Sequence, residues 1–465
     1  MTKTPTLLIT LIIGTAIWFL PVPQGLSLQA WHLFAIFFTT ILSIILGALP
    51  IFVASIIALS VSIFTSTLNT KQAYSGFSES FILLIVVAFL VSRAVVKSGL
   101  GKRVAMHLIS RFGKSTIGLG YSMFTTDMLI AAAFPSNTAR SGVLYPIVNS
   151  LAHDSGSKIS DGTRKKMGAY LMMNSMAGLG ISSALWLTAM ASNPIGAQIA
   201  NDFGIEITFD SWFLASVVPS LVAFIVIPRL LYIIYPPEIK ETPQAPIMAK
   251  ETLKKMGKMS KNEWITAITF ITMVVFWSLS SILFIDKTAI AFAGLSVLMV
   301  SKIFTIEDLK GQGEALNTLI WFSVLYTFST YLNKFGFMNF IGDHIANSLY
   351  GMPWQMVYVI LVVSYVLIHY LFVSQTAQML ALYSVFLSVA ITSKVPADLI
   401  AFMLLFATNF NSVITPQGSS ANVIFISSEY MKPTEIYKVG GILTLTNTII
   451  FLTIGTAWMM FLGYG

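Results

Sequence analysis

Long apolar stretches separated by short polar ones cover almost the whole chain. Runs such as 81–91 and 442–461 are long and predominantly apolar, whereas strands of a membrane barrel would alternate apolar and polar positions over roughly ten residues. A run of about 20 apolar residues is long enough to cross a bilayer as a helix. The pattern therefore predicts an all-α polytopic membrane protein with about eleven transmembrane helices. The expected spans are 5–22, 30–47, 50–68, 76–97, 167–190, 211–235, 263–284, 288–304, 314–333, 397–412 and 438–461.

Two further apolar regions, at about 115–150 and 352–392, are too long for one span and are interrupted at their centres. The interruptions are Pro135-Ser136-Asn137 and Val373-Ser374-Gln375. Broken backbone at membrane depth is tolerated only where it faces protein or a watery cavity. We therefore expect two re-entrant helical hairpins, each entering and leaving on one side. The amphipathic segments 98–113 and 335–350 precede them and are expected to lie along the membrane interface.

Composition supports a membrane setting. The chain of 465 residues is 56% hydrophobic and 10% charged, against about 25% charged in an ordinary soluble domain. Its net charge of +8 would suggest a nucleic-acid partner in a soluble protein, but here the basic residues gather in short loops, so no nucleic acid is expected. With no cysteine, disulfides and thiolate metal sites are excluded.

The loop charges predict how the chain is oriented. Basic residues concentrate in 93–114, 158–166 and 240–261, whereas 201–210 carries three acidic residues and no lysine or arginine. The positive-inside rule then places the N-terminus in the cytoplasm and the C-terminus outside, with the first hairpin entering from inside and the second from outside. The localisation expected is the plasma (inner) membrane of a bacterial cell.

A proline- and lysine-rich segment divides the chain. We expect 1–235 to form a first half, 236–262 a solvated cytoplasmic linker, and 263–465 a second, inverted half.

The two hairpin interruptions share residues in register, 238 positions apart. Ser136-Asn137-Thr138-Ala139 aligns with Ser374-Gln375-Thr376-Ala377, and a Leu-Tyr pair follows each motif at the same distance. Matching motifs in hairpins of opposite orientation are typical of the inverted repeats of secondary transporters.

These motifs suggest an anion site. A half-helix N-terminus presents unpaired N–H groups and roughly half a positive charge, and the neutral side chains add further donors. Two such tips meeting near mid-membrane could hold both ends of a dicarboxylate, or several groups of a tricarboxylate. The alternative is that the serines and threonines only cap the helices that begin there, and the two roles are compatible.

Each hairpin is followed by a second broken segment, 188–196 and 409–422. Proline and glycine among small polar residues free backbone carbonyls, which can coordinate a cation or complete a substrate cage. Simple helix kinks are the alternative. Additional site-lining residues expected from these segments are Ser192, Asn193, Thr415, Pro416 and Gly418.

The paired motifs, together with Tyr145-Pro146 and Thr415-Pro416-x-Gly418, resemble the divalent anion–sodium symporter (INDY) family. They look closest to its exchanger branch, which includes citrate/succinate antiporters and the plastid 2-oxoglutarate/malate translocator. The resemblance covers nearly the whole chain. It implies a homodimer, a scaffold domain, and a transport domain that moves like an elevator. It also implies that substrate carboxylates bind at Ser136, Asn137, Thr138, Ser374, Gln375 and Thr376.

The chain departs from the pattern of that family at three positions, the first two relative to its sodium-coupled members and the third relative to its exchangers. The second motif contains Gln375, the first is followed by Arg140, and Gln378 stands where many exchangers would carry histidine. A guanidinium near the site could supply the charge that sodium supplies elsewhere, because an intramembrane arginine is rarely incidental. Alternatively, Arg140 pairs with Asp127 for structural reasons. His369 is a further positive candidate, or a packing residue.

The sequence therefore predicts sodium-independent exchange of di- or tricarboxylates such as succinate, malate, fumarate, 2-oxoglutarate or citrate. A sodium-coupled dicarboxylate symporter on the same scaffold is the alternative. No zinc-protease, dinucleotide-binding or Ser/His motif is evident, so neither enzymatic activity, nor a cofactor, nor a metal site is expected. A channel is less suited to two closed tips than a carrier that occludes one molecule at a time. The partners expected are dicarboxylates, the lipid bilayer and a second copy of the chain.

Overall fold

The computed structural model describes residues 4–310 and 313–465, and these residues form an all-helical protein. Within those ranges the only strand-like pairing is a single bridge between Ser115 and Glu241. The all-α prediction is confirmed, and each of the eleven expected spans overlaps a helix.

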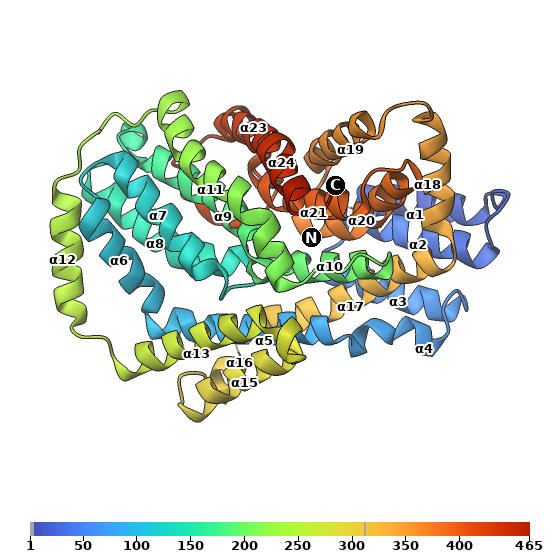
Figure 1. The fold of residues 1–465 in the computed structure, drawn as a ribbon, viewed down its shortest axis with the longest axis horizontal. Coiled ribbons are helices and arrows are strands. Elements are labelled where there is room, and N and C mark those ends of the chain that lie inside the picture. Colours follow the sequence, from blue (N-terminus) through green and yellow to red (C-terminus); the bar gives the residue numbers. More distant parts are fainter. Residues whose placement is uncertain (1–3, 311–312) are drawn as a thin grey trace.

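The helices form two groups that pack mainly within themselves (Figure 1). We call the first the scaffold group. It comprises α1 (Thr4–Phe19), α2 (Leu28–Ile45), α3 (Ile51–Phe64), α4 (Thr70–Ala73), η1 (Ser75–Ser78), α5 (Ser80–Ser98), α13 (Lys261–Ser278), α14 (Ser280–Leu283), α15 (Lys287–Val300), α16 (Ile306–Lys310) and α17 (Gly313–Lys334). Within it α17 packs against α2, α3 and α5, and α15 packs against α5 and α13.

The second group contains both hairpins, and we call it the hairpin group. Its first part is α7 (Thr116–Ala131), α8 (Asn137–Asp154), η2 (Thr163–Lys165), α9 (Gly168–Leu185), η3 (Leu187–Ala189), α10 (Ser192–Asp202) and α11 (Phe209–Ile234). Its second part is α19 (Trp354–Ile368), η4 (His369–Leu371), α20 (Gln375–Thr392), α21 (Ala397–Phe410), η5 (Asn411–Val413), α22 (Ser420–Ile426), α23 (Pro433–Ile450), the π-turn η6 (Phe451–Gly455) and α24 (Thr456–Phe461). Fully buried α9 lies at its centre and contacts α7, α8, α11 and α21.

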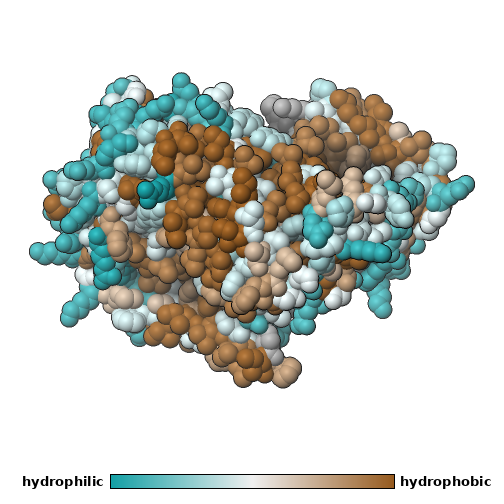
Figure 2. Space-filling view, turned by 45° about the horizontal axis from the view of Figure 1, so that its top comes forward, coloured by the Kyte–Doolittle hydropathy of each residue, from teal (hydrophilic) through white to brown (hydrophobic). Residues whose placement is uncertain are grey.

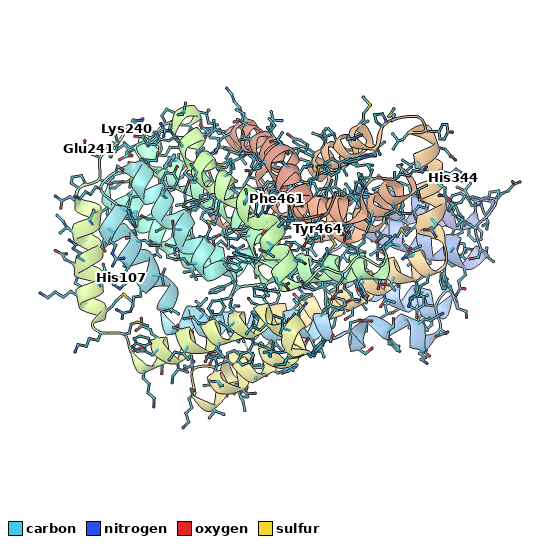
Figure 3. The ribbon with its side chains drawn as sticks, viewed as in Figure 1. His107, Lys240, Glu241, His344, Phe461 and Tyr464 are labelled. Carbon is cyan, nitrogen blue, oxygen red and sulfur yellow. The ribbon has the colours of Figure 1, made fainter. Side chains whose placement is uncertain are left out.

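Helices α6 (Leu100–Phe112) and α18 (Phe337–Ser348) connect each scaffold segment to the hairpin that follows it. They correspond to the amphipathic segments expected at 98–113 and 335–350. They lie towards opposite ends of the molecule, where His107 of α6 and His344 of α18 are labelled (Figure 3). The hairpins α7–α8 and α19–α20 likewise approach the centre from opposite ends (Figure 1).

The surface is consistent with a membrane-embedded molecule. A band of apolar side chains lies between hydrophilic ends (Figure 2). In the described part of the chain, six helices are long and apolar enough to cross a membrane. They are Leu28–Ile45, Ser80–Ser98, Phe209–Ile234, Trp354–Leu371, Gln375–Thr392 and Pro433–Phe461. Several expected spans are shorter apolar helices, such as Ala397–Val413.

The segment expected to be a solvated linker is packed against the rest of the protein. Backbone N–H groups of Glu238 and Ile239 donate to the carbonyls of Lys165 and Lys166, and Thr242 N–H donates to Lys114 O at 2.8 Å. Helix α12 (Gln244–Met256) then packs along α6. The sequence did not predict this packing, because the segment begins with prolines and its partner residues lie more than 70 positions earlier in the chain.

Helix α6 is also fastened to the start of α13 by a buried ion pair. Arg103 Nε donates to Glu263 Oε1 at 2.6 Å, and Nη2 donates to Oε2 at 3.0 Å. The guanidinium also donates to the carbonyl of Gly257 at 2.9 Å. A bidentate pair of this kind fixes direction as well as distance, so α6 is held at a defined angle to the scaffold group.

Candidate functional site

The two sequence motifs form two helix starts with the same local geometry. Ser136 is the N-cap of α8 with φ −144° and ψ 116°, and Ser374 is the N-cap of α20 with φ −154° and ψ 126°. Ser136 Oγ accepts from Ala139 N–H at 3.2 Å, and Ser374 Oγ accepts from Ala377 N–H at 3.3 Å. Both serines therefore cap their helices, while the remaining first-turn amides stay available for a ligand.

The fold brings the two tips into contact. Asn137 Nδ2 donates to Gln375 Oε1 at 3.3 Å, although the two residues are 238 positions apart in the chain. A cavity of about 440 Å³ opens beside this contact. All six residues expected to bind substrate line it, namely Ser136, Asn137, Thr138, Ser374, Gln375 and Thr376.

Each tip amide is held in one orientation by its surroundings. Asn137 Oδ1 accepts from Arg140 Nη2 at 2.5 Å and from Ser183 Oγ at 2.8 Å, which turns its NH₂ group towards the other tip. Gln375 Nε2 donates to the carbonyls of Thr408 and Asn409, which turns its oxygen towards Asn137. The contact between the tips is thus set by buried partners in both halves of the chain.

Arg140 lies behind the first tip rather than on the cavity. Its side chain is fully buried, and Nη1 donates to Asp127 Oδ2 at 2.8 Å and to Ser182 Oγ at 2.6 Å. Nη2 also donates to Leu179 O at 3.2 Å and forms a short contact with Ser183. The guanidinium fills a cluster of oxygens, and the adjacent carboxylate balances its charge. This is the structural pairing that the sequence offered as the alternative.

Gln378 is the residue in the second half that corresponds to Arg140, because each follows its own motif at the same distance. It is fully buried, its Nε2 donates to Tyr365 O at 2.6 Å, and its Oε1 accepts from Asn411 Nδ2 at 3.1 Å. His369 is buried nearby, with Nε2 at 2.9 Å from the carbonyl oxygen of Gly418. Neither residue lines the cavity.

The five residues expected from the second broken segments lie next to the tips but do not line the cavity. Ser192, Asn193, Thr415 and Gly418 are buried and Pro416 is half-buried, and none of them is among the lining residues. Instead, Asn409 Nδ2 donates to Asn193 Oδ1 at 2.9 Å, which joins the two broken segments to each other.

Several cavity residues were not expected from the sequence. Ser419 and Ser420 line the cavity, and Ser420 Oγ lies 2.8 Å from Thr138 Oγ1. Met190 and Ala191 also contribute, as does a wall from the scaffold group. The signal for Ser419 was an N-cap pattern, a serine pair before the mostly apolar segment 421–426, and Ser419 does cap α22. Nothing in the sequence indicates that this cap meets Thr138.

The chemistry of the cavity suits a transported anion, which must bind and then be released. Among the side chains that the structure describes, none that lines the cavity is charged. The N-termini of α8 and α20, each 18 residues long, both start at the cavity. Helix dipole ends and neutral hydroxyls favour negative charge without forming a permanent ion pair. Among the described residues, no group of three or more His, Asp or Glu is arranged to hold a metal ion.

Comparisons with known proteins agree on one family. Residues 1–464 match the model described as the sodium:sulfate symporter transmembrane region. A Bacillus subtilis (strain 168) protein, YflS, whose name gives malate transport as a provisional assignment, is 41% identical over 99% of this chain and 97% of its own length. Dicarboxylate transporter 1 of Spinacia oleracea chloroplasts is 39% identical over 98% of this chain and 81% of its own.

A solved structure shares the fold. The Alcanivorax borkumensis YdaH transporter superposes with a TM-score of 0.58 at 14% identity, covering 84% of this chain and 88% of its own.

Proposed function

Since the chain belongs to the sodium:sulfate symporter family, we propose that it carries dicarboxylates across a membrane by exchange, without sodium. The observation that carries this proposal is the meeting of both motifs in one cavity. Each tip offers free first-turn amides and a threonine hydroxyl, so each can hold one carboxylate. Two tips in contact then bind a molecule with two carboxylates a few carbons apart. Relatives named as malate and dicarboxylate transporters support the same substrate class.

The cavity volume suits small organic acids. About 440 Å³ exceeds the space that a four- or five-carbon acid fills and leaves room for a third carboxylate. Succinate, malate, fumarate, 2-oxoglutarate and citrate are therefore the candidate substrates.

The surroundings of Arg140 favour exchange over sodium coupling. A sodium ion needs several oxygen ligands, and the oxygens gathered behind the first tip already accept hydrogen bonds from the guanidinium. The guanidinium, whose charge Asp127 balances, permanently occupies this place, so no cation needs to bind or leave there as the carrier moves. A carrier of this kind returns to its starting conformation after it binds another anion on the opposite side of the membrane. It does not return by releasing a cation.

The division into two helix groups supports an elevator-type movement. Both tips, and therefore the substrate carboxylates, belong to the hairpin group, while the opposite cavity wall belongs to the scaffold group. We propose that the hairpin group slides against a stationary scaffold held in a homodimer. The proposed location is the plasma membrane of a bacterium, with the N-terminus in the cytoplasm.

Transport in proteoliposomes tests the function. Uptake of labelled succinate should require internal dicarboxylate and should be unchanged when sodium is replaced by potassium on both sides. Liposomes without the protein, loaded with a non-substrate anion, give the background uptake. Uptake into anion-free vesicles driven by a sodium gradient alone would support the sodium-coupled alternative. Absence of uptake of any candidate acid under all conditions would contradict dicarboxylate transport.

A further inference from the structure

The cavity has a second wall that does not belong to the hairpins. The scaffold group contributes apolar residues from the α2–α3 turn and α5, and a stripe along the first turns of α17. That stripe is Asn317, Thr318, Trp321 and Phe322. Residues three and four apart share a helix face, so all four side chains can face the cavity together.

Asn317 differs from most of this wall. Its side chain is exposed and lies at the cavity, whereas most of the scaffold wall around it is apolar: Ile44, Leu49, Pro50, Ile51, Phe89 and Phe322. An amide both donates and accepts hydrogen bonds. It can therefore meet a hydroxyl, a keto oxygen or a carboxylate. Helix α17 otherwise packs against its scaffold neighbours and against α10, α18 and α20.

The contact between the tips limits how a substrate lies. Because Asn137 reaches Gln375 at 3.3 Å, a dicarboxylate bound to both N-termini spans this contact on its cavity side. One face of its carbon chain then turns towards the tips and the other towards α17. A substituent on the second face has Asn317, with Thr318 and the Trp321 indole, as its polar neighbours.

We propose that Asn317 is a specificity-determining residue that recognises a polar substituent on the carbon chain of the substrate, on one side of the membrane only. The inference rests on the proposed function. Asn317 belongs to the scaffold group and the tips belong to the hairpin group, so sliding of the hairpin group separates them. The carrier then distinguishes a 2-hydroxy or 2-oxo dicarboxylate from an unsubstituted one in the conformation seen here, and loses that distinction in the opposite one.

Sided exchange measurements with Asn317→Ala test this. Right-side-out and inverted membrane vesicles from the same cells expose opposite faces of the transporter, and malate and succinate differ by one hydroxyl. The substitution should raise the malate concentration for half-maximal exchange about threefold to tenfold in one vesicle orientation, the effect of losing one neutral hydrogen bond. Malate in the other orientation, and succinate in both, should change less than twofold.

The matched control is Asn333→Ala, near the other end of α17 and away from this cavity, which should leave all four values unchanged. Normal succinate exchange by Asn317→Ala shows that the variant is folded. An equal loss for both acids, an equal loss in both orientations, or no change for malate would each overturn the proposal. Failure of the unmodified protein to exchange either acid would instead contradict the proposed function itself.

Discussion

Replacing Arg140 by leucine is expected to destabilise the protein by roughly 3–5 kcal/mol and to abolish transport. The side chains of Arg140 and Asp127 are 0% and 1% exposed, and their contact measures 2.8 Å. Removing one partner of a buried ion pair leaves the other as an uncompensated charge, and that charge causes most of the loss. Thermal unfolding of the purified protein in detergent would measure the first effect, and succinate exchange the second.

A double variant separates the structural role of the pair from its role at the tip. Replacing both residues by apolar ones, Asp127→Leu with Arg140→Met, removes both charges, so most of the lost stability should return. Exchange should remain at least tenfold below normal, because Asn137 Oδ1 loses its 2.5 Å donor and only the Ser183 hydroxyl remains to direct its NH₂ group at Gln375. A stable double variant that exchanges succinate normally would refute the orienting role of Arg140.

Removing a tip hydroxyl should weaken substrate binding strongly without unfolding the protein. Thr138 and Thr376 are both half-buried and line the cavity, and we expect each hydroxyl to donate to one carboxylate. A hydrogen bond to a charged group contributes roughly 1.5–3 kcal/mol, so Thr138→Ala and Thr376→Ala should each weaken binding about tenfold to a hundredfold. Binding of labelled succinate to the purified variants measures this directly.

Ser141→Ala is the matched control on the same hairpin. Its hydroxyl donates to Thr138 O at 2.7 Å, and its side chain does not line the cavity. Binding by this variant should stay within about threefold of normal. If both threonine variants bound succinate as well as the unmodified protein does, the carboxylates would not be held by the two tips.

Much of the arrangement follows from local sequence pattern. Apolar run length predicted the helices, and Ser136 and Ser374 within long apolar regions predicted the hairpin tips, because a serine N-cap and a break in hydrophobicity are local properties. The register of the two motifs predicted the equivalent geometry of α8 and α20. The division at 236–262 and the role of the motif residues in binding remain predictions.

The remaining features depend on contacts between distant segments. The meeting of Thr138 with Ser420 joins residues 282 positions apart, and no local pattern specifies such a pair. Arg140 could be assigned either to the site or to Asp127 from sequence, and its position behind Asn137 depends on how α9 packs against α8. A Cβ at Gly180 would lie 2.8 Å from Asn409 O, so the close approach of α9 to the second broken segment needs glycine there.

The most direct test is an experimental structure of the protein with a bound dicarboxylate, solved in sodium-free buffer. The account predicts one carboxylate at the N-terminus of α8, contacting the amides and hydroxyl of Asn137 and Thr138, and the other at the N-terminus of α20 beside Thr376. It also predicts the guanidinium of Arg140 in place behind the first tip. A dicarboxylate bound away from the two tips, or held by only one of them, would contradict the account.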